Sequence, residues 1–178
     1  MPLDTIRGWL GLGAAPAEEP AHAPLRRLVD TLEHLDPDRA RHLARFAYLL
    51  GRIAHADQHV SPEETSAMER LVEREGGLTG EQAVVVVGLA RSSNLLFGGT
   101  ADFLVAQEFA AAATYDEKLA LLRCLFSVAA TDDSISVAEE SEIHRIAIHF
   151  KILPPDLTAL RVAHARYLPG LRPGPASR

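Results

Sequence analysis

Six carboxylates occur at matching spacings in two places along the chain, and such oxygen-rich sets can bind cations. In each place an aspartate is followed by a glutamate seven residues later, and the second place has one further acid beside each. Hard cations such as Ca²⁺ and Mg²⁺ are bound by carboxylate and carbonyl oxygens together with water. The sequence therefore offers these acids as candidate ligands for a divalent cation. They are Asp57 and Glu64 in the first place, and Asp132, Asp133, Glu139 and Glu140 in the second.

The candidate ligands belong to a segment that occurs twice in the chain, at residues 50–78 and 125–153. Without a gap, 8 of the 29 aligned positions are identical, and both copies contain the frame A-x-x-D-x-x-[VI]-S-x-x-E. Conservative pairs such as Ile53 with Val128 fall at apolar helix positions. We interpret the repeat as a duplicated helix-loop-helix unit with an acidic loop.

The S-x-x-E part of the frame has a structural explanation as well. In a capping box, a serine hydroxyl accepts a hydrogen bond from the third residue of a helix, and a glutamate there reaches back to the serine N–H. Capping leaves unexplained the aspartates at Asp57 and Asp132, which fall where the preceding helix ends and its dipole disfavours negative charge. Two interpretations stay open: the acids are purely architectural, or they also hold a cation.

Composition predicts a single, mostly helical domain. Of the 178 residues 47% are apolar, with Leu and Ala more frequent than the residues that strands prefer. The net charge of -6 disfavours nucleic-acid binding, which depends on clustered Lys and Arg. The one cysteine, Cys124, lies in an apolar run and is predicted to be a core residue, so a reducing cytoplasm is expected. No apolar run is long enough to suggest a transmembrane segment.

The chain divides into four parts by composition. Residues 1–12 are predicted to form a separate amphipathic helix, 13–24 a flexible linker, 25–168 the helical domain and 169–178 a disordered tail. The only charges on the N-terminal helix are Asp4 and Arg7, so docking to a protein partner is favoured over peripheral contact with a membrane. Its predicted partner-binding residues are Leu3, Ile6, Trp9 and Leu10.

Capping and breaking residues predict the helices of the domain. Asp36, Ser61, Thr100 and Ser136 are the expected N-caps, Gly76 and Gly77 end one helix, and Pro154 and Pro155 stop another. Glu140 and His144, one turn apart, are expected to form a solvated pair. The predicted helices are 25–35, 37–56, 62–75, 80–92, 101–113, 116–130, 137–151 and 156–167.

The repeated frame, with each copy at a junction of two helices, resembles the TerB family, the tellurite-resistance-associated module also found in a DnaJ-like co-chaperone. The resemblance covers about residues 25–165. It implies an all-α bundle of about seven to eight helices built from two pseudo-repeated helix-loop-helix halves. It further implies acidic residues that bind divalent metal, which here are Asp57, Glu64, Asp132 and Glu139.

The chain departs from the family pattern directly after each aspartate. The family has glycine there, whereas this chain has Gln58 in one copy and Asp133 in the other. Glycine adopts a positive φ without strain, aspartate tolerates it and glutamine tolerates it less. The second loop is therefore the stronger candidate for metal.

The sequence shows no catalytic motif, so we expect a protein without enzymatic activity. The leading interpretation is a module of bacterial stress or tellurite-resistance type with a binding or scaffolding role, whose two acidic loops take Ca²⁺ or Mg²⁺. The alternative is a metal-free interaction domain that presents its N-terminal helix or its cationic C-terminus to a protein partner. The third is an enzyme whose catalytic residues are too scattered along the sequence to recognise.

Overall fold

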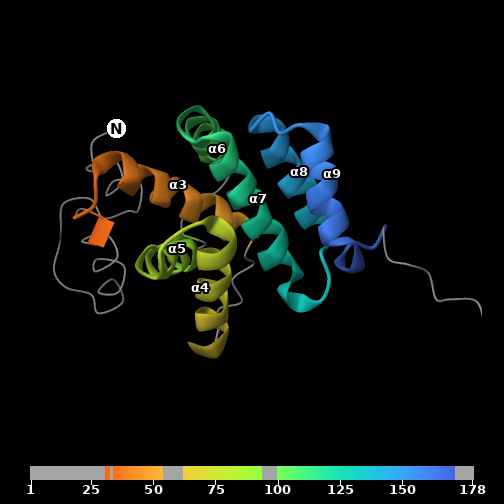
Figure 1. Ribbon diagram of the computed structural model, residues 1–178, viewed down its shortest axis with the longest axis horizontal. Coiled ribbons are helices and arrows are strands. Elements are labelled where there is room, and N and C mark those ends of the chain that lie inside the picture. The colour runs from red at the N-terminus through yellow and green to blue at the C-terminus, as the bar shows by residue number, and fades with distance from the viewer. Residues whose placement is uncertain (1–30, 33, 54–61, 94–99, 171–178) are drawn as a thin grey trace, which may run out of the picture.

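The described part of the chain is an all-helical bundle. The computed structural model describes residues 31–32, 34–53, 62–93 and 100–170, and these contain seven α-helices, two short 3-10 helices and no strand (Figure 1). None of these helices has the length and apolarity needed to cross a membrane. The α-helices are α3 (Pro37–Ile53), α4 (Pro62–Gly76), α5 (Gly80–Ser93), α6 (Thr100–Ala112), α7 (Tyr115–Ala129), α8 (Val137–His149) and α9 (Pro154–Ala163). The 3-10 helices are η2 (Ala130–Asp132) and η3 (Ala165–Tyr167).

Polar side chains start several of these helices as the sequence indicates. The Asp36 carboxylate accepts hydrogen bonds from the backbone N–H groups of Asp38 (2.9 Å) and Arg39 (3.2 Å), which confirms it as the N-cap of α3. Thr79 and Gln82 hydrogen-bond each other's backbone N–H at the start of α5. These bonds satisfy amide groups that have no partner inside a helix.

Two helices end on residues in the left-handed conformation. Gly77 follows α4 with φ +62°, at no steric cost because glycine lacks a Cβ. Lys151, two residues after the end of α8, is also left-handed, with φ 54°. Its N–H donates to Ile148 O (3.0 Å) and the next N–H, of Ile152, donates to Ala147 O (3.1 Å), which is the bonding pattern of a Schellman motif. Ile152 packs on the core, so hydrogen bonds and burial hold the lysine in a conformation better suited to glycine.

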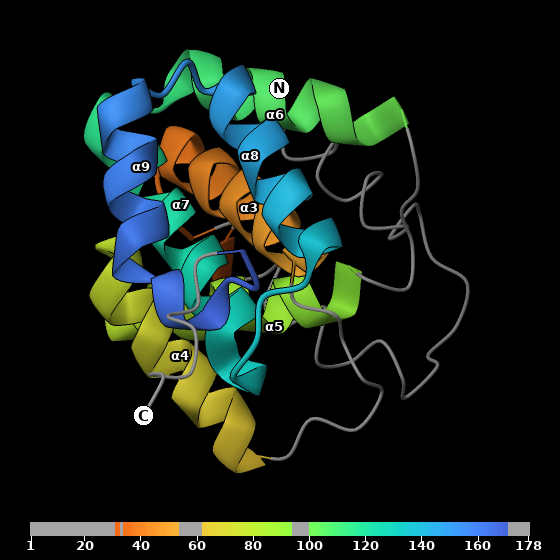
Figure 2. The same ribbon diagram turned by 90° about the vertical axis from the view of Figure 1, so that its right-hand side faces the viewer.

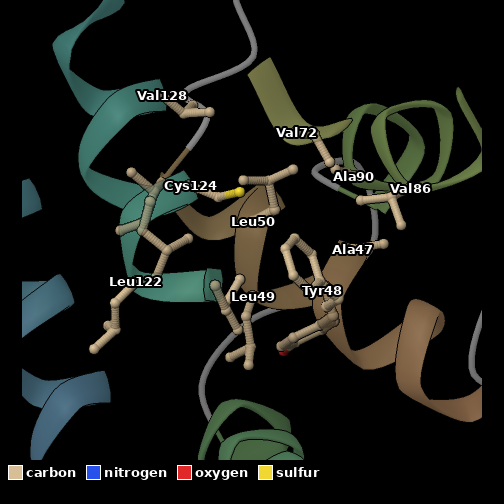
Figure 3. Packing of buried hydrophobic residues seen from close by; sticks show 14 of the residues in the cluster. Ala47, Tyr48, Leu49, Leu50, Val72, Val86, Ala90, Leu122, Cys124 and Val128 are labelled. Carbon is tan, nitrogen blue, oxygen red and sulfur yellow. The ribbon is translucent and has the colours of Figure 1, made fainter. Parts of the chain in front are cut away.

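Helix α3 lies at the centre of the bundle. Ten of its 17 residues are buried, and it packs against α5, α6, α7 and α8 (Figure 2). Helix α7 runs beside it, between α4 and α5 on one side and α8 and α9 on the other (Figure 1). Leu50 of α3, Val72 of α4 and Cys124 of α7 meet in the core (Figure 3). One hydrophobic core therefore joins the first and second halves of the described chain.

The observed helices agree with the predicted ones within a few residues, except at the last. Pro154 and Pro155 do not merely stop α8: they occupy the first two positions of α9, where the missing N–H costs nothing. That helix therefore starts earlier than expected. It also ends at Ala163, and the chain continues through η3 rather than as one helix to residue 167. The predicted helices 1–12 and, for most of its length, 25–35 lie outside the described residues.

The two repeat copies occupy the same kind of position in the chain. Each runs from the last residues of one helix into the next, from α3 into α4 and from α7 into α8. In each half an arginine from the helix that follows reaches the fourth residue of the second helix. Arg91 donates to Thr65 Oγ1 (2.7 Å), and Arg161 donates to Glu140 Oε1. Thr65 and Glu140 are matching positions of the repeat. The duplication stays a prediction, because residues 54–61 lie outside the described residues.

Candidate functional site

The second acidic loop is a tight corner between α7 and α8. Helix α7 gives way to η2, and Asp133 follows with φ 57° and ψ 13°. Ile135 is fully buried, and its N–H donates to Tyr167 O (2.9 Å), which ties the corner to η3. Asp132 and Asp133 are exposed on the outside of the corner. The fold therefore anchors the loop at Ile135 and leaves both aspartates in contact with solvent.

Asp133 shows why the second loop can do without glycine. It has a positive φ at the position where the TerB pattern has glycine. Aspartate is among the few residues that enter this region at low cost, because its short polar side chain bonds locally. The backbone at this position therefore agrees with the expectation drawn from the sequence.

Glu139 takes part in a capping box. Ser136 has an extended backbone, and its Oγ accepts from Glu139 N (3.2 Å) while Glu139 Oε2 accepts from Ser136 N (2.7 Å). The structural explanation of S-x-x-E is thus confirmed in the second copy. One carboxylate oxygen of Glu139 is committed to holding the start of α8.

Ser136→Ala is expected to lower the free energy of unfolding by about 1 kcal/mol, because it removes the hydroxyl that accepts from Glu139 N. Urea unfolding at constant pH measures the difference. Ser141→Ala is the matched control: it lies on the same helix, is exposed, and its hydroxyl only donates to Val137 O. We expect it to change stability by less than about 0.5 kcal/mol. Equal losses in the two variants would contradict the capping role.

Glu140 pairs with arginine rather than with histidine. Its Oε1 accepts from Arg161 Nε (2.9 Å) and Nη2 (2.6 Å), so it joins α8 to α9. The expected pair with His144 is not what the structure shows for Glu140. A charge-assisted, two-point contact with a guanidinium is stronger than a solvated pair on a helix surface.

The four acids of the second loop are therefore not gathered around one point. Within the described ranges, no three His, Cys, Asp or Glu side chains are placed to hold one metal ion together. Asp132 and Asp133 are exposed, Glu139 caps α8, and Glu140 pairs with Arg161 of α9. In the first loop, Asp57 lies outside the described residues, and of Glu64 only the backbone in α4 is described. The predicted partner-binding residues Leu3, Ile6, Trp9 and Leu10 also lie outside them.

Cys124 is a core residue, as expected. It is fully buried, and burial raises the pKa of its thiol to about 12. The thiolate, which is the reactive form, is then scarce at neutral pH. The side chain fills space between α3, α4 and α7 (Figure 3).

A polar cluster around His42 was not anticipated from the sequence. His42 Nε2 lies 3.9 Å from Glu117 Oε1, and its ring centroid lies 5.0 Å from that of Phe109. Burial lowers the pKa of His42. The positive charges of Arg39 and Arg45 lower this pKa further, whereas the negative charge of Glu117 raises it. Burial opposes ionisation of Glu117, but hydrogen bonds from Thr114 and the nearby cations outweigh it, so its pKa is lowered.

Part of that cluster had a signal in the sequence. Thr114 and Glu117 form a second capping box, at the start of α7, and T-x-x-E is the same kind of pattern as S-x-x-E. The contact with His42 had no such signal, because it joins residues 75 positions apart. The cluster connects α3 to α7, so we assign it a structural role in holding these two helices together.

Comparison with protein families gives a match that spans most of the helical bundle. The protein-family model described as "Tellurite resistance protein TerB" matches residues 42–162. Searches of curated proteins and of solved structures found no match. The matched region begins in α3, ends in α9 and includes both repeat copies, so it covers more than half of the chain. The chain belongs to the TerB family, the family of the tellurite resistance protein TerB.

Proposed function

We propose that this TerB-family chain, a module of tellurite-resistance type, acts as a non-enzymatic binding or scaffolding protein. The observation that supports the proposal most is that the candidate reactive groups of the chain already have structural roles. Glu139 caps α8, Glu140 pairs with Arg161, and the Cys124 thiol is buried with a raised pKa. Groups held in structural roles are poorly placed to exchange protons or attack a substrate.

We propose further that the second loop takes a divalent cation through the adjacent pair Asp132 and Asp133. The two aspartates are adjacent and solvent-exposed, and a cation beside them would offset their charge at the end of α7 and η2. These residues supply only part of an ion's ligand shell. The proposal therefore fits an ion that keeps several waters, as Mg²⁺ does, better than one fully enclosed by protein. Glu140 is excluded from the set because Arg161 holds it.

The expected result is a rise in thermal stability when cation is returned to the chelated protein. At ten times its dissociation constant, an ion that binds only the folded state stabilises it by about 1.4 kcal/mol. Thermal unfolding with Mg²⁺, Ca²⁺ and Mn²⁺ in turn measures the shift. The double variant Asp132→Asn with Asp133→Asn should abolish it, and asparagine tolerates the positive φ at 133.

Glu140→Gln is the matched control for this experiment. It should lower the starting Tm, because it weakens the contact with Arg161, while leaving the cation-dependent shift unchanged. A flat response to every ion would end the cation proposal. The same conclusion follows if the Asp132, Asp133 double variant responds as the parent does.

The metal-free interaction domain is the second candidate, and one observation favours it. Seven large apolar side chains are exposed among the described residues, and four of them lie on or between α8 and α9. Exposed large apolar side chains are candidates for contact with a partner, and these four lie on consecutive elements of the chain. The four are Val137, Ile148, Leu153 and Val162, with exposed fractions between 58% and 70%.

A further inference from the structure

His42 lies where α3 meets both α6 and α7. Its side chain is only 12% exposed, and its ring centroid lies 5.0 Å from that of Phe109 on α6. Its Nε2 lies 3.9 Å from Glu117 Oε1 on α7. One titratable ring therefore lies between three helices, so a charge on this ring acts on the junction of all three.

The charged groups around His42 balance one another while the ring is neutral. On its own helix the cations that act on it are Arg39 and Arg45. Arg45 is paired with Glu108 of α6, whose Oε2 lies 3.2 Å from Nε and 2.9 Å from Nη2. Arg39 Nη1 lies 3.9 Å from Glu117 Oε1, the same oxygen that faces His42. Two cations thus face two carboxylates, and these four groups together carry no net charge.

Protonation of His42 would add a third cation without a third carboxylate. Glu117 Oε2 is already committed, because it accepts from Thr114 N (2.8 Å) and Oγ1 (2.9 Å) in the capping box of α7. Its Oε1 would then have to serve both Arg39 and His42. The α5 residue that bonds Arg39 is the neutral Gln82 (2.7 Å), which cannot offset the charge. The surplus charge would therefore lie on a ring with little access to water, which is costly.

The pKa of His42 agrees with this count of charges. Burial is the main cause that lowers the pKa, and Arg39 and Arg45 lower it further. The attraction of Glu117 raises the pKa but does not outweigh these effects. Both the contacts and the pKa therefore favour the neutral ring in the folded chain.

Helix α6 has few other contacts to replace those around His42. It lies at the edge of the bundle and packs on α3 and α8 (Figure 2). Among its described side chains, those that are buried are Val105, Ala106 and Phe109. Segments with few buried apolar side chains open at a lower free energy than the centre of a core. A weaker junction at His42 is therefore expected to affect α6 first.

We propose that His42 is a pH-sensitive contact of the fold: the neutral ring holds α6 and the start of α7 on α3, and its protonation in mild acid releases α6 from the bundle. This inference goes beyond the proposed binding role, and its tests need no cation.

The acid response has a defined direction. The ordinary pKa of a histidine, 6.5, applies in the unfolded chain, and the pKa of His42 in the folded chain is lower. Below about pH 6.5 the unfolded state therefore binds more protons than the folded state, and stability falls until the pH reaches the folded-state pKa. The pKa of Glu117 is lowered from 4.5, so this carboxylate titrates in a more acidic range.

NMR titration of the His42 ring in the full chain tests the protonation step. The spectrum of His42→Gln identifies the ring signal, because that signal is then missing. We expect the parent ring to titrate below pH 6.5. In Glu117→Gln the midpoint should fall further, because the carboxylate that faces the ring is gone while glutamine keeps the capping box. Asp116→Asn is the matched control: it removes an exposed charge from the same turn of α7 and should leave the midpoint unchanged.

Urea unfolding from about pH 7.5 to about pH 5, with EDTA present, tests the effect on stability. The equilibrium constant of unfolding should rise about tenfold for each unit by which the folded-state pKa of His42 lies below 6.5. In His42→Gln this part of the rise should be missing, whatever the stability of the variant at neutral pH. His144→Gln removes an exposed histidine of α8 and should keep the pH dependence of the parent.

Hydrogen exchange at about pH 7.5 and about pH 5.5 locates the release. After correction for intrinsic exchange rates, the amides of α6 should lose protection at the lower pH. Those of α4, which packs on α5 and α7, should keep theirs.

Three results would overturn the proposal. The first is a His42 ring that titrates at or above pH 6.5, which would mean that Glu117 stabilises the charged ring more than burial opposes it. The second is a His42→Gln variant with the same pH dependence of unfolding as the parent. The third is an equal loss of protection in α4 and α6, which would mean that acid weakens the whole bundle and does not release α6.

Discussion

Phe109→Ala is expected to lower the free energy of unfolding by about 3–5 kcal/mol. The Phe109 side chain is 1% exposed and lies where α6 meets α3 and α8. Its ring centroid lies 5.0 Å from that of His42, 5.2 Å from that of Phe150 and 6.3 Å from that of Phe46. Truncation removes all three ring contacts and leaves a cavity that neighbouring helices can only partly close. Urea unfolding followed by circular dichroism measures the loss.

Leu104→Ala is the control for this prediction. Leu104 lies on the same helix as Phe109 but is 57% exposed, so it contributes little burial. We expect a change within about 0.5 kcal/mol. If both variants lose the same amount of stability, α6 is not held to the bundle by Phe109, and the described packing of α6 would be incorrect.

Gly51→Ala is expected to destabilise the protein by about 2–3 kcal/mol, although alanine is normally the better helix former. Gly51 lies in α3, where a Cβ would come within 2.8 Å of Ala90 O on the backbone of α5. A backbone oxygen cannot move aside as the end of a long side chain can. The substitution must therefore push α3 and α5 apart, and both helices are largely buried at this point. Thermal and urea unfolding both measure the effect.

Gly80→Ala tests whether the loss of stability expected for Gly51→Ala comes from the close contact with another helix. Gly80 begins α5, and a Cβ there would meet the carboxylate end of Glu73, with Oε1 nearest at an ordinary distance of 3.5 Å. We expect no loss of stability, or a small gain. A loss at Gly80 similar to that at Gly51 would show that glycine is required for some reason other than helix contact.

Helix boundaries were predictable because local chemistry determines them. Asp36 caps α3 through bonds to residues two and three positions ahead, and Gly77 ends α4 through its own positive φ. Such signals lie within a few residues of the boundary that they set. The start of α9 was misplaced because Pro154 and Pro155 can either end one helix or begin another. Only the position of the following residues in space decides between the two.

The candidate site was predictable only in part, for a related reason. Ser136 and Glu139 are three residues apart, so their capping box follows from sequence. Arg161 lies 21 residues after Glu140, on the following helix. No local sequence pattern predicts a contact between residues so far apart. The sequence therefore identified the four acids of the second loop, but it did not show that Glu140 forms an ion pair with Arg161.

The packing of α3 has a consequence for synthesis on the ribosome. Its apolar face needs α6 and α7 as well as α5, and α7 begins about 60 residues after α3 ends. At usual elongation rates that interval lasts on the order of 3–12 s. During this time the leucines of α3 lack the helices that cover them in the folded bundle. Final burial must wait until nearly the whole domain has left the exit tunnel.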